Sequence, residues 1–188
     1  MYFISLILAA ITVTVANSYT IDPNLENGVH FIPLLTNSTE VPGSEAVYGE
    51  SIRIGDIVFS ATDYSERSVV GKVPVPSTSI DCYHGTESRW AHDGAFNSLK
   101  ETCDSGVKIP RHGSVASGLL IARYGSSIAY ACSWGDRQGC APNEIENVWS
   151  QIGGLCGELS GGEACVRHWK KCYGYSTFRS VICSNEIM

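Results

Sequence analysis

Histidines are the first residues to examine for chemistry, because imidazole gains and loses a proton near neutral pH. The chain contains His30, His84, His92, His112 and His168. His92 is followed by Asp93 in a predicted helix, but adjacent helical residues point in different directions, so the two do not form a base and its orienting acid. The segment Gly174-Tyr175-Ser176-Thr177-Phe178 lacks the final glycine of a nucleophile elbow. The sequence therefore predicts no catalytic residue.

A ribonuclease-like hydrolase is an alternative interpretation. Such an enzyme needs a His or Glu base, an acid, and an Arg for the phosphate. The chain offers these residue types in His168, Glu163 and Arg167. Their spacing does not fix a common geometry, so this alternative depends on residue types alone.

Cations and aromatic rings are concentrated in one segment, which we expect to bind a target. The predicted contact residues are Arg167, His168, Trp169, Lys170, Lys171 and Tyr173. If the segment is a strand, alternation leaves at least one face with a cation beside an aromatic ring. Such a face suits an anionic lipid headgroup, an acidic glycan or an acidic protein surface. The alternative is that Trp169 fills the core while the Arg and Lys side chains reach solvent.

Eight cysteines predict a disulfide framework. They are Cys82, Cys103, Cys132, Cys140, Cys156, Cys165, Cys172 and Cys183. Zinc sites usually take cysteines two to four residues apart, and the closest pairs here are separated by six and seven residues. We therefore expect four disulfides and no metal site. Eight cysteines allow 105 pairings, so the sequence does not give the connectivity.

The N-terminal residues have the pattern of a secretory signal. Residues 3–16 form an uncharged apolar run, which is too short to span a bilayer as a helix. The small residues Ala16 and Ser18 favour cleavage after Ser18, with cleavage after Ala16 as the alternative. We expect residues 1–18 to be a signal peptide, the mature protein to be secreted, and no transmembrane segment to be present.

The charge is distributed unevenly along the chain. The formal net charge is -6, which argues against binding to bulk nucleic acid. Residues 19–81 contain nine acids and three bases, whereas residues 82–188 contain ten of each. We divide the mature chain into an acidic, cysteine-free N-terminal extension, residues 19–80, and a disulfide-rich α/β domain, residues 81–188. The extension could also be a removable pro-region, although no Lys-Arg pair precedes Cys82.

The extension reads as loops and short strands. Asn37-Ser38-Thr39 is a glycosylation sequon, with Asn37 as the acceptor. Residues 51–62 predict one strand with a bulge or two short strands around a turn. Residues 68–75 predict a weaker strand, because proline cannot donate to a ladder.

The cysteine-rich part predicts an α+β fold. Apolar spacing predicts helices over residues 91–104 and from Pro142 to about residue 153. Alternation predicts a hairpin over residues 117–134, a strand over 163–173 and a last strand over 180–184. We expect a disulfide-stapled two-layer sandwich, in which two helices cover one face of an antiparallel sheet of about four strands.

Several short motifs follow one another in a familiar order. They are Asp81-Cys82, Tyr130-Ala131-Cys132, Cys156-Gly157 and the segment from Trp169 to Gly174. In this order, residues 81–183 resemble the small secreted cysteine-rich effectors of fungi and the killer-toxin-like proteins. The resemblance implies an α/β sandwich. The chain lacks the cysteine-containing N-terminal motif of the smut-virus killer toxins, so ion-channel blocking is not implied.

The sequence thus predicts a secreted effector or killer-toxin-like protein that acts by binding. Its expected partner is an unknown protein, lipid or glycan of a host or competitor, and no cofactor is expected. The alternatives are a ribonuclease-like hydrolase and a cell-wall or glycan-binding protein.

Overall fold

The computed structural model describes residues 19–36, 47–57, 74–83, 85–109, 118–133, 138–177 and 180–183. Three predicted features lie outside these residues. They are the signal peptide over residues 1–18, the sequon at Asn37, and most of the strand predicted over residues 68–75.

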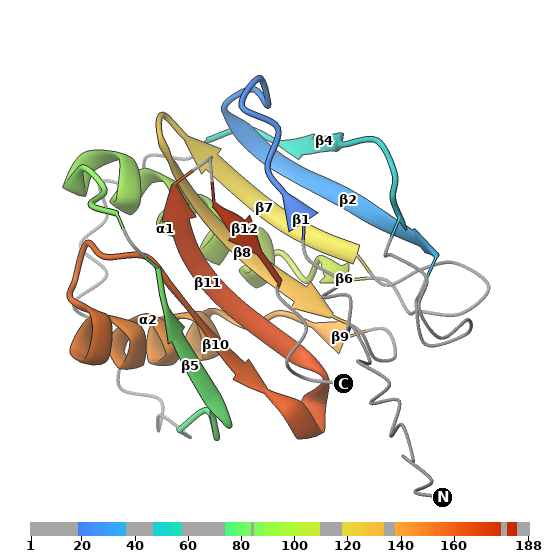
Figure 1. Ribbon diagram of the computed structural model, residues 1–188. Helices are drawn as coiled ribbons and strands as arrows, with labels where there is room; N and C mark the ends of the chain where they lie inside the picture. Colours follow the sequence, from blue (N-terminus) through green and yellow to red (C-terminus); the bar gives the residue numbers. More distant parts are fainter. Residues whose placement is uncertain are drawn as a thin grey trace, which may run out of the picture.

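The core of the structure is an antiparallel sheet of eight strands, ordered β3-β2-β7-β8-β11-β10-β5, with β4 also paired to β2 (Figure 1). Its strands are β2 (Gly28–Thr36), β3 (Val47–Tyr48), β4 (Ile52–Gly55), β5 (Ser79–Cys82), β7 (Gly118–Tyr124), β8 (Ser127–Ser133), β10 (Gly162–Val166) and β11 (Lys171–Thr177). The hairpin predicted over residues 117–134 is confirmed as β7 and β8, which meet at Gly125.

The sheet is larger than the four strands expected from sequence, because the residues before Cys82 contribute to it. β2 pairs with β7 from Gly28 to Pro33, and β3 and β4 pair with β2. At the other edge, β5 pairs with β10. The strand predicted over residues 51–62 begins as β4, and residues from 58 onward lie outside the described part of the chain.

In the part of the chain that the structure describes, two helices cover one face of the sheet, as expected. α1 (Arg89–Asp104) packs on β7 and β8, and α2 (Pro142–Cys156) packs on β10 and β11. The Ser88 hydroxyl caps α1 by accepting from the Ala91 amide at 3.3 Å. α2 begins at Pro142, as predicted, but runs past Gly153 to Cys156, where a disulfide joins its end to Cys82.

The opposite face of the sheet is covered by a second, smaller layer. β1 (Tyr19–Thr20) pairs with β12 (Val181–Ile182), and Figure 1 shows both in front of β7 and β8. Alternation along β7 turns Leu120 and Ala122 toward the helices and Leu119 and Ile121 toward this second layer. The strand predicted over residues 180–184 is therefore present but shorter.

The prediction of a single strand over residues 163–173 is wrong. The segment is divided into β10, a 3-10 turn at Arg167–Trp169, and β11. Lys170 has a φ of 53°, so the chain reverses there, and the two strands pair with each other. The residues expected to alternate between two faces instead form a connection at one end of the sheet.

All eight cysteines are paired, which confirms the expected disulfide framework. The pairs are Cys82–Cys156, Cys103–Cys140, Cys132–Cys183 and Cys165–Cys172. Disulfides of this number are typical of proteins that fold in an oxidising compartment. In the described part of the chain, no helix is both long and apolar enough to span a membrane.

Candidate functional site

The connection between β10 and β11 carries most of the predicted contact residues. We call residues 167–170 the basic turn. Arg167, His168 and Lys170 are exposed there, and Trp169 is half-buried against the helix-side core. Three exposed nitrogen-bearing side chains and one half-buried indole ring thus occupy four consecutive residues.

A disulfide closes the base of the basic turn. Cys165 and Cys172 lie directly opposite each other in the β10–β11 ladder, with their Cα atoms 4.1 Å apart. The next pair, Val166 and Lys171, is the last before the turn. The turn therefore cannot widen at its base without distorting the ladder, and its side chains project from a fixed platform.

Hydrogen bonds fix the backbone of the turn itself. The Lys170 amide donates to the Arg167 carbonyl at 3.0 Å, and the Arg167 amide donates to the Thr78 hydroxyl at 3.0 Å. The Gln138 side chain, in the short strand β9 (Gln138–Gly139), donates to the Trp169 carbonyl. A turn held in this way loses little conformational freedom on binding, which favours affinity.

The other two predicted contact residues, Lys171 and Tyr173, lie at the start of β11, directly after the turn. Lys171 is 4% exposed and Tyr173 is fully buried. The Lys171 ammonium donates to Glu144 at 2.7 Å and to the Gly139 carbonyl at 2.9 Å, and the Tyr173 hydroxyl donates to Glu144. Burial, followed by the nearby Glu144 charge, raises the pKa of Tyr173. These contacts anchor the start of β11 to the first turn of α2.

The residues considered for ribonuclease chemistry do not come together. His168 and Arg167 are exposed in the basic turn, whereas Glu163 is 1% exposed. The Glu163 carboxylate accepts hydrogen bonds from Tyr130 and from the Cys183 amide. These partners hold it beneath the second layer, so it does not share a surface with the other two residues.

His92 lies against the carboxylate of Glu87 and not that of Asp93. The Glu87 carboxylate lies 3.3 Å from His92 Nδ1, and both side chains are buried, whereas Asp93 is exposed. The His92 ring stands edge-on to Tyr175, with the ring centroids 4.7 Å apart. A carboxylate on Nδ1 is the arrangement that orients a catalytic imidazole, but here the ring packs within an aromatic cluster. Sequence pattern does not point to Glu87, because this residue precedes the Ser88 cap and its approach to His92 depends on where α1 begins.

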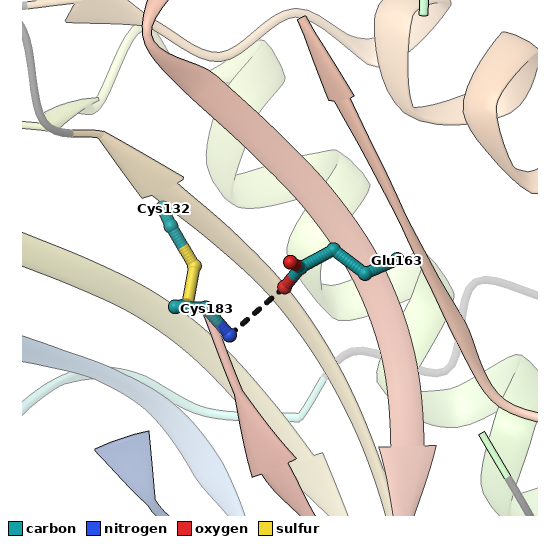
Figure 2. A group of neighbouring side chains, drawn as sticks. All are labelled: Cys132, Glu163 and Cys183. Atoms are coloured by element: carbon teal, nitrogen blue, oxygen red, sulfur yellow. Dashed lines mark hydrogen bonds between the residues drawn. A yellow bond between two sulfur atoms is a disulfide. The ribbon is translucent and has the colours of Figure 1, made fainter. Parts of the chain in front are cut away.

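Glu163 is a buried carboxylate on the other side of the sheet. Figure 2 shows it beside the Cys132–Cys183 disulfide. One carboxylate oxygen accepts a hydrogen bond from the Cys183 amide at 2.8 Å. The Tyr130 hydroxyl donates to the same oxygen at 3.0 Å. The Cys132 and Cys183 sulfurs are bonded to each other, so they offer no thiolate to a metal ion. In this oxidised form the group is a hydrogen-bonded anchor.

Within the described residues, only the basic turn places several predicted functional side chains at the surface together. It is therefore the candidate site that the described structure supports best, an exposed turn with the positive charges of Arg167 and Lys170. Comparison with known protein families, with curated proteins and with solved structures found no match to this chain.

Proposed function

We propose that this protein is a secreted effector or killer-toxin-like protein that binds an acidic target on a host or competitor through the basic turn. The observation that carries the proposal is the exposure of Arg167, His168 and Lys170 in a turn that also contains the half-buried Trp169 and is closed by the Cys165–Cys172 disulfide. Secretion is supported by the apolar run at residues 3–16 and by the four disulfides.

The charge of the site favours an anionic partner. The Glu144 carboxylate, which lies beneath the turn, already accepts hydrogen bonds from Lys171 and Tyr173. The Lys171 ammonium also lies 5.4 Å from the centroid of the Trp169 ring, beneath the turn. Arg and Trp are frequent anchors of protein interfaces, where the ring supplies buried area and the cation supplies specificity.

The first experiment compares two double variants with the same change in charge. Arg167→Glu/Lys170→Glu reverses two exposed charges of the basic turn. Arg53→Glu/Arg89→Glu reverses two exposed arginines elsewhere, whose ion pairs with Glu26, Asp56 and Glu158 are also exposed. Exposed ion pairs contribute little to stability, so we expect both variants to fold.

The assay is infiltration of purified protein into leaf tissue and application to competing fungi, over a range of concentrations. We expect wild type and the Arg53/Arg89 variant to give the same response, and the basic-turn variant to need at least a tenfold higher concentration. Equal responses for all three proteins would contradict the proposed site. No response to wild-type protein in several hosts and strains would contradict the proposed function.

Two further measurements compare the alternatives with this proposal. Retention of the wild type on insoluble chitin, glucan or cellulose would favour a cell-wall protein. Degradation of RNA that is lost in His168→Ala would favour the hydrolase.

A further inference from the structure

The second layer covers an apolar face of the sheet with only a short two-stranded ribbon. Its ribbon consists of β1 paired with β12, in which Tyr19 faces Ile182 and Thr20 faces Val181. Ile21, Ile182 and Cys183 pack with residues of the sheet in one buried cluster. The sheet residues of this cluster include Ile32, Leu119, Ile121, Ile128 and Tyr130. Because a two-stranded ribbon is marginally stable in water, its attachment to the sheet must hold it in place.

Two attachments meet at Cys183. The first is the disulfide to Cys132 in β8, and the second is the hydrogen bond from the Cys183 amide to Glu163 in β10. Figure 2 shows both on the same residue. The disulfide is a single-point tether, so the ribbon on either side of it depends on packing and on the Glu163 contact.

Glu163 is an ionisable group in an apolar place. Among the described residues, the groups that face it are Tyr130 from β8, Asp81 from β5, Tyr83 just after β5, Tyr48 from β3, the disulfide-bonded Cys165 sulfur of β10, and the Cys183 amide. None of these groups is a cation. A carboxylate buried without a positive partner loses more by desolvation than it regains from neutral donors.

The direction of the effect on the pKa agrees with this geometry. Burial raises the pKa of Glu163 from 4.5 to about 7, and the hydrogen bonds from Cys183 and Tyr130 offset only part of that rise. Burial also raises the pKa values of Tyr130 and Tyr83, so both phenols remain donors at neutral pH. Glu163 is therefore the group in this cluster whose pKa burial moves into the neutral range.

We propose that Glu163 makes the closure of the β1–β12 ribbon pH-dependent, with the ribbon held firmly in acid and loosened when the carboxyl group ionises. Lifting Cys183 away from the sheet admits water to Glu163, which stabilises the charged carboxylate more than the neutral acid. Closure is therefore linked to proton uptake, and the ribbon opens more often as pH rises.

The magnitude follows from the linkage. If the carboxyl has its ordinary pKa of 4.5 in the open state and about 7 when closed, raising the pH from 5 to 8 increases the opening equilibrium constant by about 70-fold. Ionisation is complete well above pH 7, so the increase levels off there. The Cys132–Cys183 bond keeps the opened ribbon attached throughout.

The test is amide hydrogen exchange, followed by NMR at pH 5 and pH 8 and corrected for intrinsic exchange rates. We expect protection of residues 19–21 and 181–183 to fall by up to about 70-fold at pH 8, and to stay below that of β7 and β8 at both pH values. Glu163→Gln, which keeps an acceptor for the Cys183 amide, should remove the pH dependence. Glu87→Gln, which changes a buried carboxyl on the helix side, should leave it intact.

Equal ribbon protection at the two pH values in wild type would overturn the proposal, as would the same pH dependence in Glu163→Gln. If that variant does not fold, wild type alone decides. Ribbon amides that exchange at the same rate as those of β7 and β8 would show that the ribbon does not open separately.

Discussion

Lys170 and Lys171 are neighbours in sequence with opposite environments. Replacing each by methionine distinguishes the role of an exposed lysine of the basic turn from that of the buried lysine beneath it. Lys170 is exposed, whereas the Lys171 side chain is 5% exposed and bonds to Glu144 and to the Gly139 carbonyl. Methionine fills the volume of the Lys171 stem but removes its charge, so Lys171→Met leaves the Glu144 carboxylate without its cation.

Breaking one side of a buried ion pair costs about 3 to 5 kcal/mol. Glu144 is 23% exposed and keeps the Tyr173 hydroxyl as a donor, so we expect a loss near the lower limit, about 3 kcal/mol. For a protein of this size that loss lowers the urea midpoint by about 1.5 M. Lys170→Met should change the free energy of unfolding by less than about 0.5 kcal/mol.

Urea unfolding followed by tryptophan fluorescence measures both variants. Adding Glu144→Gln to Lys171→Met removes the stranded charge and keeps an acceptor for Tyr173, so the double variant should regain at least half of the loss. The reasoning is refuted if Lys171→Met is no less stable than Lys170→Met. It is also refuted if the loss of unfolding free energy in the double variant equals the sum of the losses in Lys171→Met and in Glu144→Gln alone.

Two further predictions concern the framework. The Cys82–Cys156 and Cys165–Cys172 bridges join residues 74 and 7 positions apart. Loop entropy therefore predicts that Cys82→Ala/Cys156→Ala lowers the free energy of unfolding by about 4.5 kcal/mol and Cys165→Ala/Cys172→Ala by about 2.5 kcal/mol. A larger loss for the second variant, measured by urea unfolding, would contradict this. Gly174→Ala would place a Cβ 2.4 Å from the Tyr130 hydroxyl and should cost about 3 kcal/mol. Gly154→Ala, in α2, would place a Cβ with no atom within 4 Å beyond its own stretch of helix and should instead stabilise by about 0.5 kcal/mol. Equal melting temperatures for the two variants would contradict the packing.

Local sequence patterns predicted the elements whose ends are marked by turn or helix-start residues. The β7–β8 hairpin has alternating apolar residues on both sides of Gly125, and α2 begins at Pro142 with Glu144 in its first turn. These signals depend on neighbours within a few residues, so they can be read without knowledge of the fold.

The features that the sequence did not predict depend on distant partners. β2 contains Pro33 and has no clear alternation, and it forms a strand because β7 pairs with it. Residues 163–173 alternate well enough to suggest one strand, but the Cys165–Cys172 pairing requires a reversal between them. That pairing is one of many that eight cysteines allow.

Residue type alone also does not show which residues of the predicted target-binding segment are exposed. Arg167, His168, Trp169 and Lys170 were selected by residue type, and the structure brings them together in the basic turn. Lys171 and Tyr173 have the same residue types, but they are buried because β11 runs beneath α2. Burial of a lysine or tyrosine is set by tertiary packing, which composition does not reveal.

Binding of fluorescently labelled protein to the surface of a responding tissue or competing fungus tests the central claim most directly. We expect wild type and Arg53→Glu/Arg89→Glu to bind with equal dissociation constants that increase with salt concentration. Arg167→Glu/Lys170→Glu should bind at least tenfold more weakly. Equal binding by the two double variants would contradict a binding site at the basic turn.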